Sequence, residues 1–190
     1  MNLIVHLLLL AALSGLAGAA WVAQRPADLG GIRQAAPDDT RRPRDVLDDL
    51  KQAAIKRSAV FEITEADLNH HLARVLQAGT LPPLNRWAAF ARAAAALQPG
   101  QLEVTLVWEV LGSPRTATFR FHIQRLEGSF RVVLTGGSYG RLRVPRGLLR
   151  PMLPALEQLG LALEQEIQAL FQMNQIQISE HKLVIDPRFP

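Results

Sequence analysis

The sequence predicts an α+β fold in which a long curved antiparallel sheet packs around C-terminal helices, with a membrane or signal helix at the N-terminus. Large apolar side chains recur at every second position between Leu102 and Leu134, as in strands that bury one face. Apolar residues with helical spacing follow Pro145 and supply a cover for that face. An almost unbroken apolar run over residues 3–12 opens the chain.

The apolar run at the N-terminus has the composition of the h-region of a secretory signal. The small residues Ala17-Gly18-Ala19 suit cleavage by signal peptidase before Ala20. Apolar residues continue through Ala23, so residues 1–23 are also long enough for an uncleaved membrane anchor. The sequence therefore predicts export to the cell envelope or periplasm, with the domain either anchored by the N-terminal helix or released after cleavage near Ala19.

The 190 residues contain no cysteine, which excludes both a lipid anchor on cysteine and disulfide bonds. An apolar core must therefore stabilise the fold, and we expect a single α+β domain over residues 59–190. Residues 24–58 are expected to be a flexible linker, because their first part is rich in Pro, Gly, Asp and Arg without periodicity. Apolar positions within residues 44–57 predict a short amphipathic helix in this linker. We favour its packing on its own domain over contact with a membrane or a partner.

The first elements of the domain are predicted from capping and alternation. A short strand over residues 59–63 leads into Thr64-Glu65-Ala66-Asp67, which has the form of a capping box and predicts a helix of about 14 residues. The Ala-rich segment 87–97 has the composition of a helix, but a turn and a strongly alternating strand follow it. We therefore expect at least its second half to be extended.

Three strands then form a meander, with turns at Gly112-Ser113-Pro114 and Glu127-Gly128. Their alternation assigns one apolar face and one polar face to the sheet. The apolar face is predicted to contain Leu102, Val104, Leu106, Trp108, Val110, Phe119, Phe121, Ile123, Phe130, Val132 and Leu134. The polar face is predicted to contain Glu103, Thr105, Glu109, Arg120, His122, Gln124, Arg131 and Thr135.

The helices that cover the apolar face are predicted after Pro145, a position where proline suits the first turn of a helix. Pro151 and Pro154 kink or break the first of these helices. A second helix is predicted over residues 161–171, and a hairpin of two short strands over residues 175–186 ends the chain.

Basic residues are concentrated in the second half of the chain, although the formal net charge is only +4. Between residues 115 and 150 a single acidic residue, Glu127, accompanies eight arginines: Arg115, Arg120, Arg125, Arg131, Arg141, Arg143, Arg146 and Arg150. We interpret them mainly as surface cations, with attraction to anionic lipid headgroups as the alternative. An exported protein without a helix-turn-helix, zinc-finger or stacking motif is not expected to bind nucleic acid.

No arrangement of residues in the sequence predicts catalysis. His70 and His71 are adjacent, so they point in different directions on a helix and are expected to be solvated rather than to share a metal ion. Ser138 lies in Gly137-Ser138-Tyr139-Gly140, but the spacing and the surrounding strands differ from those of a nucleophile elbow. We therefore expect no enzymatic activity, no metal and no cofactor.

Three short motifs resemble those of YpmS-like bacterial envelope proteins and, more distantly, those of the tubular lipid-binding (TULIP) superfamily. They are Ile63-Thr64-Glu65-Ala66-Asp67-Leu68-Asn69 at a helix start, Gly140-x-Leu142-x-Val144-Pro145 before a long helix, and the terminal pair Ile176-x-Ile178 and Lys182-Leu183-Val184-Ile185. The similarity extends over residues 61–186. It implies a curved sheet wrapped around a helix, with an apolar interior that holds lipid in some relatives, and it implies no catalytic residue.

Two functions are compatible with the sequence. In the first, the protein binds a lipid or another apolar ligand between the sheet and the helices, because flexible Met and Leu side chains suit acyl chains. The candidate lining residues are Trp108, Phe119, Phe121, Phe130, Met152, Leu156, Leu163, Leu170 and Phe171. In the second, the helices fill this face completely and the protein is a structural or protein-interaction scaffold of the envelope, with a protein partner that the sequence does not identify.

Overall fold

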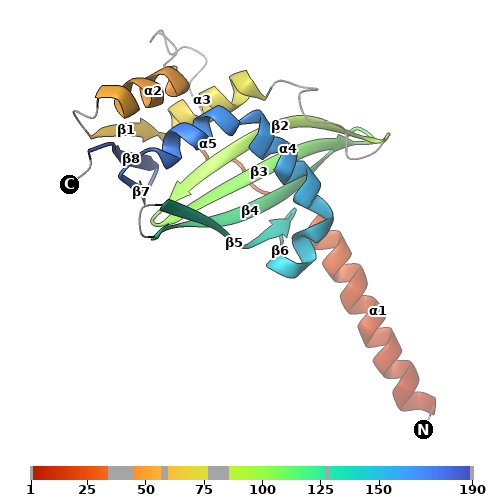
Figure 1. Cartoon of the computed structure of the whole chain (residues 1–190). Helices are drawn as coiled ribbons and strands as arrows, with labels where there is room; N and C mark the ends of the chain where they lie inside the picture. The colour runs from red at the N-terminus through yellow and green to blue at the C-terminus, as the bar shows by residue number, and fades with distance from the viewer. Residues whose placement is uncertain (1, 34–44, 57–59, 77–85, 127–128, 189–190) are drawn as a thin grey trace.

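The computed structural model describes residues 2–33, 45–56, 60–76, 86–126 and 129–188. It confirms the α+β fold class. A five-stranded antiparallel sheet, a three-stranded sheet and helices form the domain, and an apolar helix at the N-terminus precedes it in the chain (Figure 1). The buried apolar side chains form two clusters, one against the large sheet and one around the small sheet.

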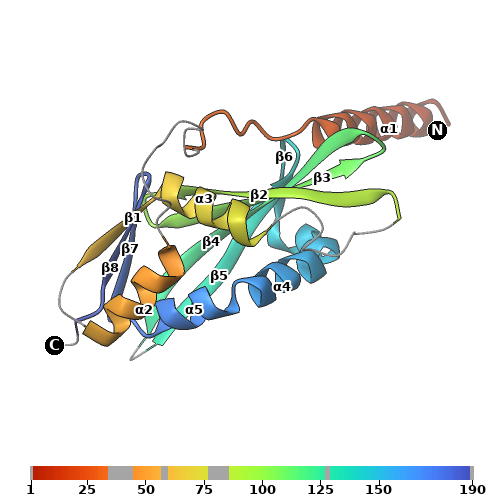
Figure 2. The same cartoon turned by 90° about the horizontal axis from the view of Figure 1, so that it is seen from above.

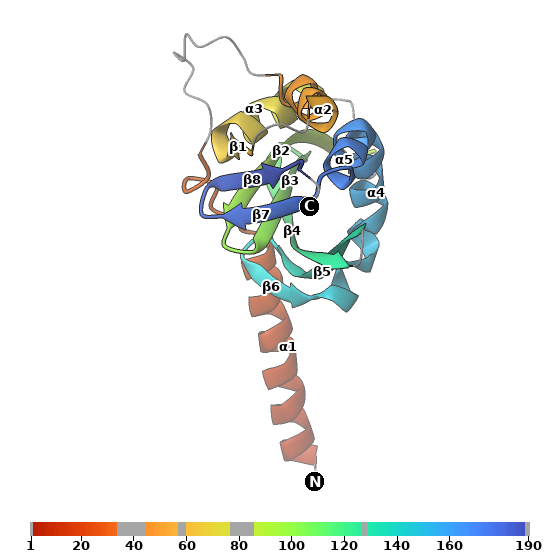
Figure 3. The ribbon, with the colours of Figure 1, turned by 60° about the vertical axis from the view of Figure 1, so that its left-hand side comes forward.

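The large sheet is a meander of five strands in sequence order: β2 (Ala88–Gln98), β3 (Gln101–Val110), β4 (Ser113–Leu126), β5 (Ser129–Tyr139) and β6 (Leu142–Pro145). The three-strand meander predicted from alternation is therefore confirmed, and one strand is added on each side. The Ala-rich segment is extended along all of β2, because pairing with β3 outweighs the helix propensity of Ala. The strands curve around the interior (Figures 2 and 3).

The strand register confirms the predicted inner face in β3 and β4. Leu102 lies opposite Phe121 and Val104 lies opposite Phe119, so the large side chains of the two strands share one face. Phe119 and Leu106 are completely buried. The centre of the sheet therefore has the dry apolar face that alternation predicts.

Helices α4 (Leu153–Ala162) and α5 (Glu164–Phe171) lie across the open side of the curved sheet (Figure 3). The predicted break at the prolines is confirmed, because a 3-10 helix, η1 (Arg146–Met152), precedes α4. Leu149 of η1 is fully buried against Gly137 of β5. A Cβ at position 137 would overlap the backbone carbonyl of Thr118 and lie 2.9 Å from Leu149 Cδ1, so this position requires glycine.

The small sheet brings together distant parts of the chain. Strand β1 (Phe61–Thr64) pairs with β8 (Lys182–Asp186), and β8 pairs with β7 (Gln175–Ser179), all antiparallel. The predicted terminal hairpin is thereby confirmed. It returns the end of the chain to the strand that opens the domain.

Helix α3 (Glu65–Val75) begins directly after β1 with the predicted capping box. The Thr64 hydroxyl accepts a hydrogen bond from the Asp67 N–H at 3.2 Å, and the Asp67 carboxylate accepts one from the Thr64 N–H at 3.3 Å. Leu72 packs into the core cluster of the large sheet. The helix lies along β2, the edge strand of that sheet (Figure 2).

Helix α2 (Val46–Lys56) packs on its own domain, as we expected. Val46 and Leu50 are buried in the core cluster of the small sheet, and the helix contacts α5. The packed part of the chain therefore begins before residue 59, where the sequence places the start of the domain. Val46, Leu50 and Ala53 lie on the face of this helix that packs against the core.

Residues 25–33, which the sequence assigns to a flexible linker, lie along the outer face of the large sheet. The Ala27 N–H donates a hydrogen bond to the Thr116 hydroxyl at 2.8 Å. The segment covers part of the face that alternation marks as polar: Thr105 is 4% exposed, and its hydroxyl lies 2.9 Å from that of Thr118. These residues are thus a bound segment rather than a free linker, and the following part of the linker lies outside the described residues.

Helix α1 (Asn2–Gln24) projects away from the domain with its apolar side chains exposed (Figure 1). Among the described residues it is the one helix with the length and composition to cross a membrane, a property that signal sequences share. At its C-terminal end the carbonyls of Ala23 and Arg25 rest on Gly140, whose φ of 53° and close contacts both favour glycine. The helix is compatible with a signal peptide or a membrane anchor.

We predict that Leu50→Ala lowers the free energy of unfolding by about 2–5 kcal/mol, because it removes a buried side chain from the core. Ile55→Ala on the same helix is the matched control, since Ile55 is 81% exposed and its loss should change stability little. Urea unfolding of the full chain in a mild detergent, followed by tryptophan fluorescence, measures both variants. Equal small effects would show that α2 is not part of the cooperative core.

Candidate functional site

An apolar cavity of about 400 Å³ lies between the inner face of the large sheet, helices α2 to α5 and the small sheet. It occupies the place where the two core clusters meet, since residues of both clusters line it. Its volume falls in the range of ligand pockets, ~300–1,000 Å³. The apolar lining comprises Val46, Leu50, Ile63, Leu68, Leu72, Ala95, Leu102, Val104, Phe121, Ile123, Val132, Leu156, Leu159, Gly160, Leu163, Ile167, Leu170, Phe171, Ile176 and Leu183.

Small residues on two of the surrounding elements leave this part of the interior unfilled. Ala95 lies on β2 and Gly160 lies on α4, and both line the cavity. A Cβ placed at Gly160 would have no heavy atom within 4 Å. Side chains of ordinary core size at these positions would occupy volume that this sequence leaves free.

The cavity reaches the surface between β5 and α5. Val132 of β5 and Phe171 of α5 both line it, and they are 45% and 44% exposed. The ring of Phe130 stacks on that of Phe171 with centroids 6.5 Å apart, so a pair of aromatic rings flanks the opening. This opening gives an apolar molecule a route from the surface to the interior.

Five of the nine residues predicted to line a ligand site do line this cavity: Phe121, Leu156, Leu163, Leu170 and Phe171. The other four lie elsewhere. Trp108 and Phe119 are buried in the filled part of the core, and Met152 packs against the same cluster. Phe130 belongs to the ring pair at the opening. Alternation identifies the inner face of a strand, but it does not show where along the strand the covering helices leave space.

Two polar side chains interrupt the apolar lining, His71 of α3 and Glu166 of α5. His71 Nε2 lies 2.8 Å from Glu166 Oε1, and His71 is 3% exposed. The expectation that His71 is solvated is therefore wrong, whereas its neighbour His70 is exposed. The reason is helix geometry, because His71 lies three residues after Leu68 and four before Val75, and both of these pack against the core.

A chain of polar contacts connects this pair to the surface. Arg74 Nη2 lies 3.2 Å from His71 Nδ1 and 3.1 Å from Asp45 Oδ1. A guanidinium only donates, so His71 Nδ1 accepts, and Nε2 carries the proton that it donates to Glu166. The hydrogen bond from Arg74 also holds the pKa of Asp45 below its usual value. The contacts join α3 to α5 and to the residue that precedes α2.

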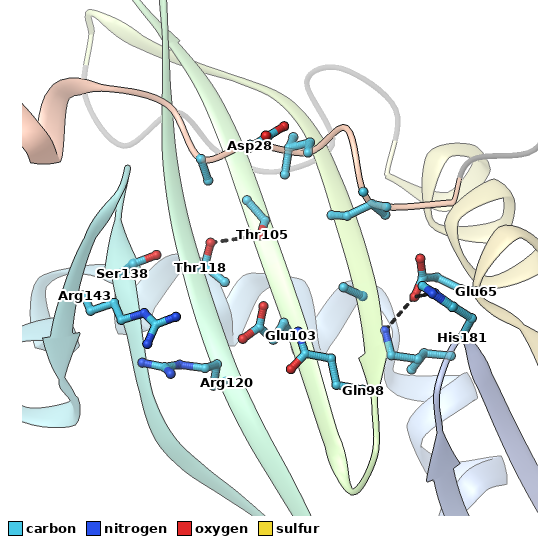
Figure 4. A pocket seen from close by; sticks show the side chains of 16 residues that line it. Asp28, Glu65, Gln98, Glu103, Thr105, Thr118, Arg120, Ser138, Arg143 and His181 are labelled. Atoms are coloured by element: carbon cyan, nitrogen blue, oxygen red, sulfur yellow. Dashed lines mark hydrogen bonds and ion pairs between the residues drawn. The ribbon is translucent and has the colours of Figure 1, made fainter.

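A second polar group joins α3 to the free edge of β2, and Figure 4 shows two of its members, Glu65 and His181. Asn69 pairs with both backbone groups of Ala95: Nδ2 donates to the carbonyl at 2.8 Å, and Oδ1 accepts from the N–H at 2.7 Å. Two residues along, the Leu97 N–H donates to Glu65 Oε2 at 2.8 Å, and the Leu97 carbonyl accepts from the His181 N–H at 3.0 Å. Side chains and a turn thus satisfy this part of the edge in place of another strand.

Glu65 is 1% exposed, and hydrogen-bond donors surround its carboxylate. Oε1 accepts from the Arg33 N–H at 2.8 Å, and Oε2 lies 3.1 Å from His181 Nδ1 in addition to its bond with Leu97. Burial alone would raise the pKa of Glu65, but the hydrogen bonds from Leu97, Arg33 and His181 outweigh it and hold the pKa below its ordinary value. The fold is therefore built around a charged carboxylate.

The described residues also include the candidate metal ligands and Ser138. Within the described ranges, no three His, Asp or Glu side chains are grouped as metal ligands are. Ser138 lies on β5 with Arg143 as its partner on β6 and Thr118 as its partner on β4.

Comparison with known protein families, curated proteins and solved structures finds no match for this chain. The geometry of the cavity is thus the basis for a functional assignment.

The sequence carries signals for some of the polar residues of the site and none for others. Glu65 and Asn69 stand in the helix-start motif, and their i, i+4 spacing indicates a shared helix face. The position of His71 between Leu68 and Val75 indicates burial in the same way. Nothing in the sequence indicates the meeting of His71 with Glu166, because 95 residues separate them.

We predict that Glu65→Gln lowers the free energy of unfolding at neutral pH by about 1–3 kcal/mol, because it leaves buried N–H donors facing a neutral amide. The pKa of Glu65 is lowered from its ordinary value of 4.5. Its stabilising contribution is therefore full above about pH 4.5 and is lost as the pH falls through the lower folded-state pKa. Urea unfolding from neutral pH to about pH 3 measures this difference between variant and unmodified protein.

The matched control is Glu62→Gln on β1, whose side chain is 52% exposed and pairs with Lys182 at the surface. It should change stability little at any pH. An effect of Glu65→Gln that equals that of Glu62→Gln, or that does not diminish in acid, would contradict the role assigned to the buried carboxylate.

Proposed function

We propose that this protein is a non-enzymatic module of the cell envelope that binds a lipid or another apolar ligand in the cavity. The observation that carries the proposal is a cavity of about 400 Å³ with an almost wholly apolar lining and an opening between β5 and α5. Voids larger than a water molecule are few in close-packed domains, so a cavity of this size favours an occupant.

The volume of the cavity favours a ligand with a single acyl chain inside it. A water molecule takes ~30 Å³ of the liquid, which is close to the volume of a methylene group, so the cavity has room for roughly a dozen such groups. Because His71 and Glu166 already pair with each other in the interior, a charged headgroup is better solvated at the opening. The ligand class we propose is therefore a fatty acid or one chain of a lipid.

The N-terminal helix supports a location at a membrane, where such ligands occur. We propose that α1 either anchors the domain in the envelope or is removed as a signal peptide, and that the membrane is the source of the ligand. The resemblance of three short motifs to those of YpmS-like proteins and the TULIP superfamily adds support, because some members of those groups hold lipid in an apolar interior.

A structural or protein-interaction scaffold is the second candidate function. A scaffold is expected to have a core that is filled everywhere. The part of the interior around Trp108 and Phe119 is filled in this way. Native mass spectrometry of the purified full chain separates the two candidates. A co-purifying lipid supports the binding module, and its absence favours the scaffold.

We predict that Gly160→Phe abolishes uptake of a fluorescent fatty acid while the protein remains folded, because the ring occupies free volume in the cavity. Gly160→Ala is the control for helix propensity, and it should retain binding and stabilise α4 by up to about 1 kcal/mol. Ala155→Phe on the same helix is the control for close packing, since Ala155 lies in the filled core and overpacking costs about 1–3 kcal/mol.

Fluorescence titration measures uptake, and thermal unfolding measures the stability of the same three variants. The proposal fails if the unmodified chain takes up no fatty acid and Gly160→Phe destabilises it as much as Ala155→Phe does. That combination would show that the region around Gly160 behaves as close-packed core.

A further inference from the structure

A second pocket, of about 340 Å³, lies on the outer face of the large sheet (Figure 4). Residues 27–32, which follow α1 closely, form its roof, and strands β2 to β6 form most of its floor. Its lining is rich in charged and hydroxyl side chains, and the sheet separates it from the apolar cavity. What it binds is therefore a question independent of the proposed function.

Two arginines from different strands converge in this pocket. Arg120 lies on β4 and Arg143 lies on β6, with β5 between them. Arg120 reaches across β5 at Gly136: its Nη2 lies 3.6 Å from the position of a Cβ at that residue, and it donates a hydrogen bond to the Gly137 carbonyl at 3.4 Å. Figure 4 shows the two guanidinium groups pointing toward one another at one end of the pocket.

A hydroxyl group lies on the strand between the two arginines. Ser138 of β5 is the register partner of Arg143, and it lines the same pocket. The neighbouring hydroxyls of Thr105 and Thr118 are hydrogen-bonded to each other at 2.9 Å. The Ser138 hydroxyl has no hydrogen bond to the part of the chain that the structure describes, so it is available to a ligand.

Three carboxylates, those of Asp28, Glu65 and Glu103, line the same pocket, but none of them forms an ion pair with the converging guanidinium groups. Among the described residues, no carboxylate lies within 4.0 Å of either guanidinium group. Glu103 is the register partner of Arg120 and brings its negative charge to the same pocket, but the hydrogen bond that its carboxylate accepts, at 3.0 Å, comes from Gln101 and not from Arg120. Asp28 in the roof accepts one from the Gly30 N–H at 2.9 Å. Two like charges at short range repel each other, and an anion between them removes that repulsion.

We infer that Arg120, Arg143 and Ser138 form a binding site for the phosphate group of a phosphate ester. Guanidinium groups hold pairs of phosphate oxygens, and a third donor from a separate strand suits a tetrahedral anion better than a planar carboxylate. Glu65, also in the lining, already accepts hydrogen bonds from Arg33, Leu97 and His181. The carboxylates of Glu103 and Asp28 therefore favour a ligand whose remaining part donates hydrogen bonds, as hydroxyl groups do. The ester is either soluble or the headgroup of a lipid, since the roof of the pocket leads directly into α1.

The test is isothermal titration calorimetry of the full chain in an uncharged detergent, with inorganic phosphate, glycerol 3-phosphate and a short-chain phosphatidic acid as probes. We expect saturable binding, and Arg120→Gln and Arg143→Gln should each weaken it by about tenfold or more. Arg120→Lys keeps the charge but loses the planar fork, so it should also weaken binding. Arg131→Gln, at an exposed position of β5, is the matched control and should retain the affinity.

The pattern across probes identifies the source of the phosphate. Tighter binding of phosphatidic acid than of glycerol 3-phosphate, with both sensitive to Arg120→Gln, indicates a lipid headgroup, and equal affinities indicate a soluble ester. Thermal unfolding shows whether each variant is folded. The inference is overturned if no probe binds the folded protein, if Arg131→Gln weakens binding as much as Arg120→Gln, or if Arg120→Lys binds as the unmodified chain does, because each result would leave only a general basic surface.

Discussion

Alternate residues of β2 turn their backbone N–H and C=O groups away from β3, and these groups need partners because an unpaired backbone group buried from water is costly. Asn69 and Glu65 supply those partners from α3, and the N–H of the turn residue His181 supplies another. The Glu65 carboxylate also receives the N–H of Arg33. One small group of side chains therefore sets the positions of the large sheet, the terminal hairpin and the segment that follows α1.

Separate helices cover the inner face of the large sheet. Helix α3 lies along β2, and α4 and α5 cover the opposite side (Figure 3). Prolines after β6 divide this second cover into η1, α4 and α5. Leu149 of η1 fills the space over Gly137, whereas Ala95 and Gly160 leave space farther along. The cavity thus results from the small side-chain volume at positions on regular strands and helices, and His71 and Glu166 connect α3 to α5.

The two faces of the large sheet differ in polarity: the inner face lines an apolar cavity, and the outer face lines a polar pocket. Phe121 points to the apolar cavity, and Arg120, next to it in the chain, lines the polar pocket. The segment that roofs the polar pocket is continuous with α1, so this pocket is connected to the helix that is apolar enough for a membrane. The sheet separates the two sites, so the two proposals concern separate ligands.

Local patterns in the sequence determined the elements. Alternation determined the meander of β3, β4 and β5, Thr64 and Asp67 determined the start of α3, and the prolines determined the break before α4, because each pattern acts on neighbouring residues. The tertiary structure alone decided which inner positions are filled and which are hollow, so Trp108 packs tightly while Leu163 lines a cavity. It also decided the burial of α2, the binding of residues 25–33, and the meetings of His71 with Glu166 and of Arg120 with Arg143. These features depend on contacts between residues that are far apart in the chain. Sheet curvature and side-chain volume set the geometry of those contacts, and periodicity and spacing in the sequence predict neither of them.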